Sequence, residues 1–195
     1  MHLLTISPQT DVVVFAPKGG GKTTFIRDLV KRFKGNIFIY DYHHEYQDLQ
    51  GKNIVVYLPH FSNGTLEQRQ VEMSEVVKRF VKNKELRIQL FVVSEADEYF
   101  PSKFPLPDFA QDIANNSRHY GFATVYDVRR PYDLNSKIVD LCYYKIFFKL
   151  WGAFDLRYCE EIKSGLSQQI DALGEYEYIV IDGKGNVTKE KPVML

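Results

Sequence analysis

The sequence predicts an α/β fold: a central, mostly parallel sheet with helices on both faces and a C-terminal β-hairpin. Segments with strand character alternate with segments whose apolar residues recur at the 3.6-residue period of a helix. Several strand segments are apolar throughout, which is typical of parallel strands buried on both faces. A short apolar segment followed by the turn sequence of residues 182–186 predicts the hairpin.

These patterns place the elements in chain order. We expect strands over residues 11–16, 37–40, 54–58, 88–93, 121–126, 142–150 and 176–181, with Val187 in the second strand of the hairpin. We expect helices over residues 22–33, 66–82, 109–118, 153–162 and 167–173, with Asp108 as the cap of the third. Prolines at positions 101, 105 and 107 indicate an irregular loop before that helix. Because no long linker interrupts this series, residues 1–195 are expected to form a single domain.

Composition limits the possible partners. The 195 residues include 25 basic and 25 acidic side chains, so the formal net charge is zero. This balance excludes a general electrostatic attraction to nucleic acid, and DNA contact would need a local basic patch or a ring of subunits around a channel. Cys142 and Cys159 form no disulfide pattern, which fits a reducing, intracellular compartment. The sequence contains no apolar run of the roughly 20 residues that a membrane span needs, and its first residues do not form a signal peptide.

The stretch between the first predicted strand and the first predicted helix has the features of a phosphate-binding loop. Consecutive glycines let backbone N–H groups curl around an anion, and the helix N-terminus adds positive partial charge. Lys22 would reach the β- and γ-phosphates of a nucleoside triphosphate, and the Thr23 hydroxyl would hold Mg²⁺. Ala16 replaces the first glycine of the usual pattern. The expected nucleotide contacts are Pro17, Lys18, Gly19, Gly20, Gly21, Lys22, Thr23 and Thr24.

The residues after strand 88–93 are candidates for water and metal chemistry, because ligands of open α/β sheets bind at the carboxyl ends of the strands. An ATPase needs a glutamate there to orient the attacking water and an aspartate to help hold the Mg²⁺ shell. Glu95 stands at the glutamate position and is the expected catalytic residue. Ser94 takes the aspartate position, where its hydroxyl can contact a metal-bound water without adding charge. Alternatively, Asp97 and Glu98 form the acid pair, or the segment is only an acidic helix start.

Four segments, residues 41–46, 94–97, 116–122 and 129–134, follow strand and helix signals in a consistent order. In this order they resemble motifs of the HerA/FtsK superfamily of hexameric DNA-pumping ATPases. Residues 94–97 resemble the D-E-A-H box of this family, and residues 116–122 and 129–134 resemble its G-R-x-x-G-V and T-Q-R-P-x-D motifs. The resemblance covers about residues 11–150 and implies a P-loop NTPase of the RecA/FtsK-like type, a three-layer sandwich. The family signature D-P-H-G-E-Y corresponds to Asp41-Tyr42-His43-His44-Glu45-Tyr46.

The resemblance also implies roles for two arginines. Arg118 matches an arginine that reaches the nucleotide of the neighbouring subunit, where it would stabilise charge on the transferring phosphoryl group. A surface arginine at a helix end is the alternative. Arg129 stands where the family has a sensor glutamine, and it can contact phosphate but cannot orient water as an amide does. His43 and His44 beside Glu45 suggest a metal site, which is disfavoured because adjacent side chains of an extended chain point in opposite directions.

A chain of this length without an accessory domain resembles the viral genome-packaging ATPases of the superfamily. The resemblance implies an enzyme that hydrolyses ATP with Mg²⁺ and threads dsDNA into a preformed capsid as a homo-oligomeric ring, expected to be a hexamer. Capsid or portal vertex proteins would be partners, and the host cytoplasm or the virion the location. Alternatives are another DNA-pumping, conjugation or filamentous-phage assembly ATPase of the superfamily, and a nucleotide-binding regulatory protein that hydrolyses little. Lys52 and Lys103 are the candidate DNA contacts, or else ordinary surface lysines.

Overall fold

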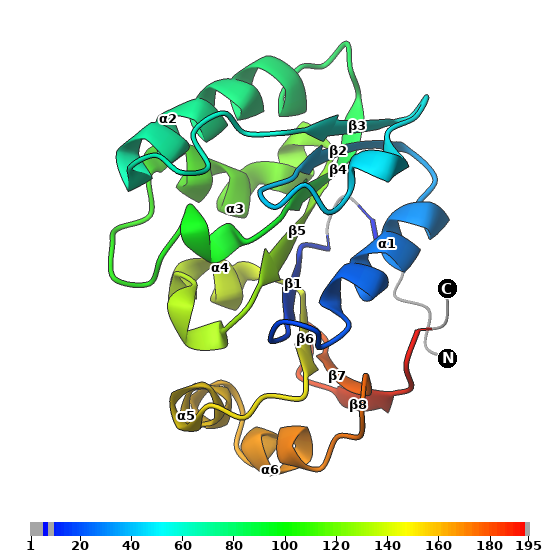
Figure 1. The fold of residues 1–195 in the computed structure, drawn as a ribbon, viewed down its shortest axis with the longest axis vertical. Coiled ribbons are helices and arrows are strands. Elements are labelled where there is room, and N and C mark those ends of the chain that lie inside the picture. The colour runs from blue at the N-terminus through cyan, green and yellow to red at the C-terminus, as the bar shows by residue number, and fades with distance from the viewer. Residues whose placement is uncertain (1–5, 8–9, 194–195) are drawn as a thin grey trace.

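The computed structural model describes residues 6–7 and 10–193, which fold around one eight-stranded sheet (Figure 1). The strands are β1 (Val12–Phe15), β2 (Asn36–Tyr40), β3 (Ile54–Tyr57), β4 (Ile88–Val93), β5 (Ala123–Val128), β6 (Tyr144–Phe148), β7 (Tyr178–Ile181) and β8 (Val187–Glu190). Their order in the sheet is β3-β2-β4-β5-β1-β6-β7-β8. The strands from β3 to β6 in this order pair in parallel, and β7 and β8 add an antiparallel hairpin. The predicted mostly parallel sheet and terminal hairpin are thus confirmed.

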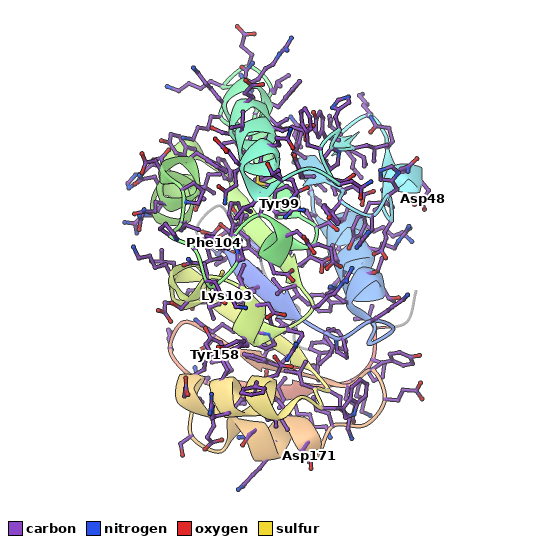
Figure 2. All side chains as sticks on the ribbon, turned by 60° about the vertical axis from the view of Figure 1, so that its left-hand side comes forward. Asp48, Tyr99, Lys103, Phe104, Tyr158 and Asp171 are labelled. Atoms are coloured by element: carbon purple, nitrogen blue, oxygen red, sulfur yellow. The ribbon has the colours of Figure 1, made fainter. Side chains whose placement is uncertain are left out.

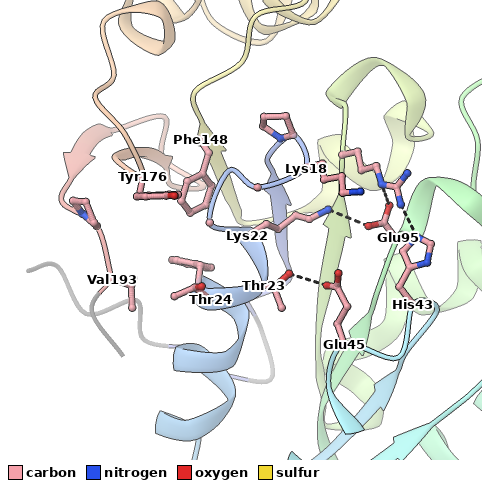
Figure 3. A pocket seen from close by; sticks show the side chains of 16 residues that line it. Lys18, Lys22, Thr23, Thr24, His43, Glu45, Glu95, Phe148, Tyr176 and Val193 are labelled. Atoms are coloured by element: carbon pink, nitrogen blue, oxygen red, sulfur yellow. Dashed lines mark hydrogen bonds and ion pairs between the residues drawn. The ribbon is translucent and has the colours of Figure 1, made fainter. Parts of the chain in front are cut away.

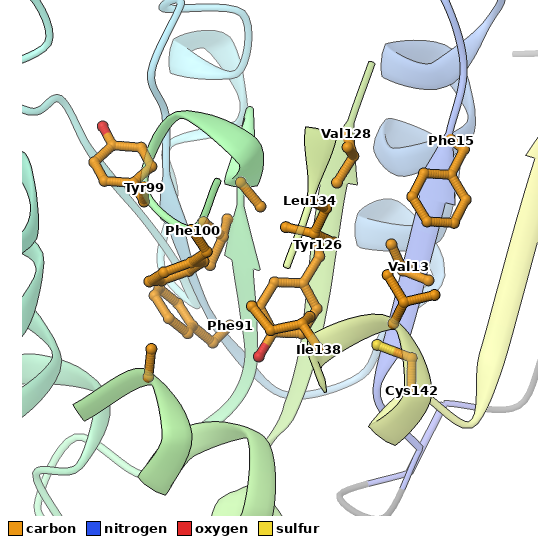
Figure 4. Close-up of a cluster of buried hydrophobic side chains, with 14 of the residues drawn as sticks. Val13, Phe15, Phe91, Tyr99, Phe100, Tyr126, Val128, Leu134, Ile138 and Cys142 are labelled. Atoms are coloured by element: carbon orange, nitrogen blue, oxygen red, sulfur yellow. The ribbon is translucent and has the colours of Figure 1, made fainter. Parts of the chain in front are cut away.

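Helices pack on both faces of the sheet, as predicted. They are α1 (Lys22–Arg32), α2 (Leu66–Val76), α3 (Asp108–Tyr120), α4 (Ser136–Leu141), α5 (Ala153–Ile162) and α6 (Leu166–Asp171). Alternate residues of β1 point to opposite faces. Val12 and Val14 pack with α1, whereas Val13 and Phe15 pack in the cluster that α2 to α6 cover (Figures 1 and 4). The sheet is therefore the middle layer of three.

The β1–α1 unit is anchored on the core from both sides. Every residue of β1 is fully buried. Four apolar side chains of α1 at helical spacing are buried in the cluster that contains Val12 and Val14. Burial of each such side chain stabilises the fold by about 1.5–3 kcal/mol. The loop between the two elements is held rigidly as a result. The four α1 side chains are Phe25, Ile26, Leu29 and Val30.

The structure corrects the prediction for the third helix. Asp108 does not cap it: α3 begins at Asp108 itself, and Pro107 is the N-cap residue, with no side-chain cap hydrogen bond. The carboxylate lies instead in the first helical turn, where it faces the positive end of the helix dipole. Gly121 ends α3 with a φ of 85° and therefore belongs to the helix cap, not to β5.

Two further differences concern helices. The predicted helix over residues 66–82 is α-helical only to Val76 and continues as a π-helical segment, Val77–Val81, in which the Lys82 N–H donates to the Val77 carbonyl five residues back. The sequence interpretation missed α4. Its start is marked by Asn135, whose side chain accepts a hydrogen bond from the Lys137 N–H at 3.2 Å.

Candidate functional site

A cavity of about 590 Å³ lies where the parallel strands end, in the size range of small-molecule sites (Figure 3). The loop between β1 and α1 forms one wall, and residues at or just beyond the carboxyl ends of β2, β4, β5 and β6 form much of the rest. This is the edge at which open α/β sheets bind ligands. The lining residues are Pro17, Lys18, Gly19, Gly21, Lys22, Thr23, Thr24, Phe25, His43, Glu45, Glu95, Arg129, Phe148, Tyr176, Pro192 and Val193.

The loop before α1 has the backbone of an anion cradle. Gly19 and Gly21 have φ values of 76° and 95°, a conformation that favours glycine. Gly20 packs behind the loop, where a Cβ would lie 3.0 Å from the Pro17 carbonyl. Gly21 is the N-cap of α1 and makes no side-chain cap bond, so the first-turn N–H groups remain for an anion.

Charged side chains of opposite sign converge beside this loop. Lys22 Nζ lies 2.5 Å from Asp127 Oδ1 and 3.4 Å from Glu95 Oε1. The other oxygen of the Glu95 carboxylate, Oε2, lies 2.7 Å from Nε of Arg129. A second nitrogen of Arg129, Nη2, donates to Nε2 of His43 (Figure 3). The formal charges of the two cations and the two carboxylates cancel.

Burial governs how these groups hold their protons. Burial lowers the pKa of Lys22, but the negative charges of Asp127 and Glu95 outweigh this effect, so the pKa lies above its usual value and the ammonium is retained. Burial raises the pKa of Asp127 to about 6, although Lys22 beside it favours the carboxylate. Lys22 therefore stays a cation that can neutralise phosphate.

The backbone aims Glu95 into the cavity. β4 ends at Val93, and Glu95 has a φ of 50°, which is unusual for a residue other than glycine. Such strain persists where the surrounding structure enforces it, often at functional sites. Ser94 continues the sheet with its N–H donating to the Tyr40 carbonyl at 3.0 Å, and its buried hydroxyl has no hydrogen-bond partner within residues 6–7 and 10–193. Asp97 lies in the next turn and does not line the cavity, so the geometry favours Glu95 over the alternative acid pair.

The loop after β2 has a role that the sequence alone did not reveal. The buried carboxylate of Asp41 accepts hydrogen bonds from the N–H groups of Glu45 and Tyr46, at 3.0 and 2.8 Å. This turn points Glu45 at α1, where its carboxylate accepts a hydrogen bond from the Thr23 hydroxyl at 2.7 Å, and directs the Tyr46 hydroxyl to Asp127 at 3.1 Å. Asp41 is thus the residue that positions the other two.

Asp127 is the site residue that sequence reasoning missed. It lies on β5 with no exposed surface and pairs with Val14 of β1. The last pair of β4 and β5 is Val93 with Tyr126, so Ser94 and Asp127 are the residues that directly follow this pair along the two segments. The missed signal was a carboxylate inside an otherwise apolar strand, since a buried charge needs a partner. Ser94 brings no charge to the position where an aspartate was expected. The carboxylate of Asp127, on the neighbouring strand β5, supplies negative charge nearby.

The remaining predicted residues lie outside the cavity. Arg118 is exposed on α3, on the other face of the sheet from α1. Lys52 and Lys103 are exposed on loops, and Figure 2 shows Lys103 with Phe104 on the loop between β4 and α3. Arg130 forms an ion pair with Asp155 at 3.1 Å.

The residues present fit a magnesium ion held mainly by phosphate. Within the described part of the chain, no three His, Cys, Asp or Glu side chains are grouped to hold a metal by themselves. Mg²⁺ is commonly bound by one or two protein groups, substrate phosphates and water. Because the Thr23 hydroxyl donates its hydrogen bond to Glu45, its oxygen lone pairs stay available to a cation. The Ser94 hydroxyl, which has no hydrogen-bond partner among the described residues, can accept a hydrogen bond from a metal-bound water.

Comparisons with known proteins agree with this fold. No protein-family model matches the chain, and no curated protein matches it. Its structure is similar to the genome packaging NTPase B204 of Sulfolobus turreted icosahedral virus 2 in complex with ATP-gammaS, with a TM-score of 0.78, 20% identity, and coverage of 97% of this chain and 100% of that chain. The conjugation coupling protein TcpA of pCW3, with ATPgS, gives a TM-score of 0.64 and 14% identity over 93% of this chain and 59% of that one.

The similarity extends to a third solved structure. The N-terminal domain of zonular occludens toxin from Neisseria meningitidis gives a TM-score of 0.54 at 9% identity, with 95% of each chain covered. At these identities the likeness establishes the fold, that of a P-loop NTPase, and the site chemistry must be argued from this chain's own residues. Among the described residues, no helix is both long and apolar enough to cross a lipid bilayer.

Proposed function

We propose that this chain is a P-loop ATPase that drives dsDNA into a viral capsid. The observation that carries the proposal is the convergence of Lys22, Thr23 and Glu95 on one cavity, on a fold shared over 97% of the chain with a genome packaging NTPase. The sequence motifs beyond the phosphate-binding loop support the same proposal, because they resemble those of the HerA/FtsK superfamily. The chain would act as a homo-oligomeric ring, expected to be a hexamer.

The residues divide the chemistry of ATP hydrolysis between them. Lys22 would leave its carboxylate partners and neutralise the β- and γ-phosphates. Glu95 would accept a hydrogen bond from the attacking water and orient it. Arg129, which now pairs with Glu95, would contact the γ-phosphate, so ATP would also free the glutamate.

Mg²⁺ would join the site together with the nucleotide. Bound there, it would neutralise charge on the phosphates. Thr23 would hold it directly, and Ser94 would hold its water shell. Asp127, buried beside Ser94, would keep negative charge near this shell after Lys22 moves to the phosphates.

The contacts with DNA and other subunits belong to the assembled ring. A chain without net charge has no general attraction to DNA, so Lys52, Lys103 or other basic residues would have to face a common channel. Arg118 would reach the nucleotide of the neighbouring subunit. Capsid or portal vertex proteins would be the partners, and the host cytoplasm or the virion the location.

A second candidate is a nucleotide-binding regulatory protein that hydrolyses slowly. Two observations favour it. Ser94 brings no charge to the metal shell, and Arg129 stands at the position of the sensor glutamine and pairs with Glu95 at 2.7 Å. A conjugation or filamentous-phage assembly ATPase is the other alternative, since TcpA and the zonular occludens toxin domain share the fold.

ATP turnover by the purified full chain, with and without linear dsDNA, tests these functions. We expect wild-type turnover that rises with dsDNA, and a loss of at least about a hundredfold in Glu95→Gln with ATP binding retained. Glu67→Gln, an exposed glutamate on α2, is the matched control and should behave as wild type. Equally slow turnover of wild type and Glu95→Gln would reject the packaging ATPase in favour of the regulatory protein.

A further inference from the structure

The cavity has two ends of different chemistry. Figure 3 shows Glu95 and His43 at one end, with the phosphate-binding loop in the middle. Arg129 belongs to the same end, because it contacts both Glu95 and His43. At the other end lie apolar and aromatic side chains, and Figure 3 shows Phe148, Tyr176 and Val193 there, beyond Thr24. Among the described lining residues of this end, none carries a charge. Its members are Thr24, Phe25, Phe148, Tyr176, Pro192 and Val193.

The antiparallel hairpin brings the C-terminal segments to this end. β7 runs against β6, with Phe148 opposite Tyr178, so the residues just before β7 lie at the carboxyl end of β6. β8 runs back against β7, with Tyr178 opposite Glu190, so the residues after β8 return to the same edge. Tyr176 and Val193 therefore meet at the cavity although 16 residues separate them.

The aromatic end is built directly onto the phosphate-binding loop. A Cβ at Gly21 would lie 3.1 Å from Tyr176 Cδ1 and 3.3 Å from Phe148 Cε1, so both rings touch the backbone that would hold phosphate. Phe148 is held by Phe25 and Tyr178, at ring-centroid distances of 5.9 and 5.2 Å. The site for the phosphates and the aromatic end are thus continuous.

Tyr176 presents its ring to the open side of the cavity. Its φ is 58°, a conformation that is unusual for a bulky residue, and 46% of its surface is exposed. A flat aromatic surface beside a phosphate site can stack on a nucleobase, whose π-face suits it whatever the base.

We propose that Phe148, Tyr176, Pro192 and Val193 form a subsite that holds the nucleobase of a nucleotide by stacking and apolar contact. This inference rests on the proposed nucleotide site and adds the recognition of its base. With the γ-phosphate near Glu95 and the triphosphate along the loop, the nucleoside extends toward Tyr176. Because the lining of this end offers mainly stacking and apolar contact, which does not depend on the hydrogen-bonding edge of a base, we expect adenine and guanine to bind alike.

Binding measurements that separate the base from the triphosphate test the proposal. Isothermal titration calorimetry on the full chain would compare AMP-PNP, GMP-PNP and inorganic tripolyphosphate, in wild type, Tyr176→Ala and Tyr176→Phe. Wild type should bind AMP-PNP about tenfold or more tightly than tripolyphosphate, because stacking of one base on an aromatic ring contributes binding free energy of about this size. Tyr176→Ala should lose about tenfold in AMP-PNP affinity without a change for tripolyphosphate, whereas Tyr176→Phe should keep both.

The matched control is Tyr120→Ala, which removes a tyrosine of similar exposure from the end of α3, outside the cavity. It should leave all three affinities unchanged, and GMP-PNP should bind wild type within about threefold of AMP-PNP. Equal wild-type affinities for AMP-PNP and tripolyphosphate, or an equal loss of both in Tyr176→Ala, would overturn the subsite while leaving the phosphate site intact. A wild-type chain that binds none of the three would overturn the proposed function as well.

Discussion

Lys22 of the phosphate-binding loop and Asp127 of β5 form an ion pair of 2.5 Å that is almost completely buried. The pair joins the start of α1 to the middle of the sheet, because β5 is the direct neighbour of β1. Lys22 is also the residue that would bind the phosphates of a nucleotide. The charge that we propose binds nucleotide is thus also part of what holds the loop in place.

The pair should therefore contribute measurably to stability. Lys22→Met and Asp127→Asn should each lower the free energy of unfolding by about 3 kcal/mol, since each deprives a buried charge of its nearest partner of opposite charge. The double variant should lose at least about 1 kcal/mol less than the sum. Urea denaturation at pH 8 without nucleotide gives all four values.

The control cycle uses Lys189 and Glu177, a pair at 2.6 Å whose lysine is 52% exposed. Its coupling should be about 0–1 kcal/mol, as for surface pairs. Strictly additive effects of the Lys22 and Asp127 substitutions would contradict the prediction.

Asp97 should make stability depend on pH. Burial, reinforced by the charge of Glu95, raises the pKa of its carboxyl from 3.8 to about 7. Between these pH values the folded chain binds a proton that the unfolded chain has lost, so the contribution of Asp97 makes stability fall as the pH rises. Above pH 7 the penalty is at most about 4 kcal/mol.

Asp97→Asn removes this penalty. Relative to wild type, the variant should gain free energy of unfolding at pH 8, and the gain should shrink toward zero near pH 3, below both pKa values, where Asp97 is mostly protonated in both states. Denaturation curves at the two pH values measure it, with Asp140→Asn, an exposed carboxylate on α4, as the control. A gain of the same size at both pH values would rule out the titration of Asp97 as its cause.

His44 occupies a backbone position suited to glycine. Its φ is 61°, and the family signature D-P-H-G-E-Y has glycine at the corresponding place. His44→Gly should raise the free energy of unfolding by about 0.5–1 kcal/mol, since the removal of Cβ strain exceeds the entropy that glycine costs.

The urea midpoint at an unchanged m-value reports this gain. Lys52 is an exposed loop residue whose φ is not positive, so Lys52→Gly should leave the free energy of unfolding unchanged or lower it. A loss of stability in His44→Gly would mean that the imidazole makes a contact worth more than the strain.

The parts of the site that were predictable depend on local sequence. The loop from Pro17 to Thr24 and the acid Glu95 could be placed because strand, turn and helix signals are contiguous there. Asp127 could not, because β5 was expected to end at Tyr126, and only the pairing of β5 with β1 brings the carboxylate to Lys22. Position in a sheet between strands far apart in sequence is not encoded in any short segment.

The aromatic end of the cavity was missed for the same reason. Tyr176 and Val193 look like ordinary hairpin flanks in the sequence, and only two antiparallel pairings bring them to the phosphate-binding loop. The sequence motif around Asp41 could be identified from the sequence, but the function of Asp41 in it follows only from the structure. The hydrogen bond that Asp41 accepts from the Glu45 N–H explains why Glu45 faces Thr23.

Arg118 can be tested as a residue that acts on a neighbouring subunit. It is exposed on α3 and does not line the cavity of its own chain, so a catalytic role requires a second chain. Arg118→Ala and Lys22→Ala should each lower ATP turnover by at least about a hundredfold. Mixed before assembly, they should recover activity at about a quarter of the sites, where an intact Lys22 meets an intact Arg118 by random assembly.

The control mixture pairs Lys22→Ala with the double variant Lys22→Ala/Arg118→Ala, which contains no complete site in any arrangement and should stay inactive. Analytical ultracentrifugation would verify that the mixed chains form rings. Because the recovered sites combine one residue from each of two chains, activity in the first mixture and none in the control can only arise between subunits. Full activity of Arg118→Ala alone would instead make Arg118 an ordinary surface residue at the end of α3.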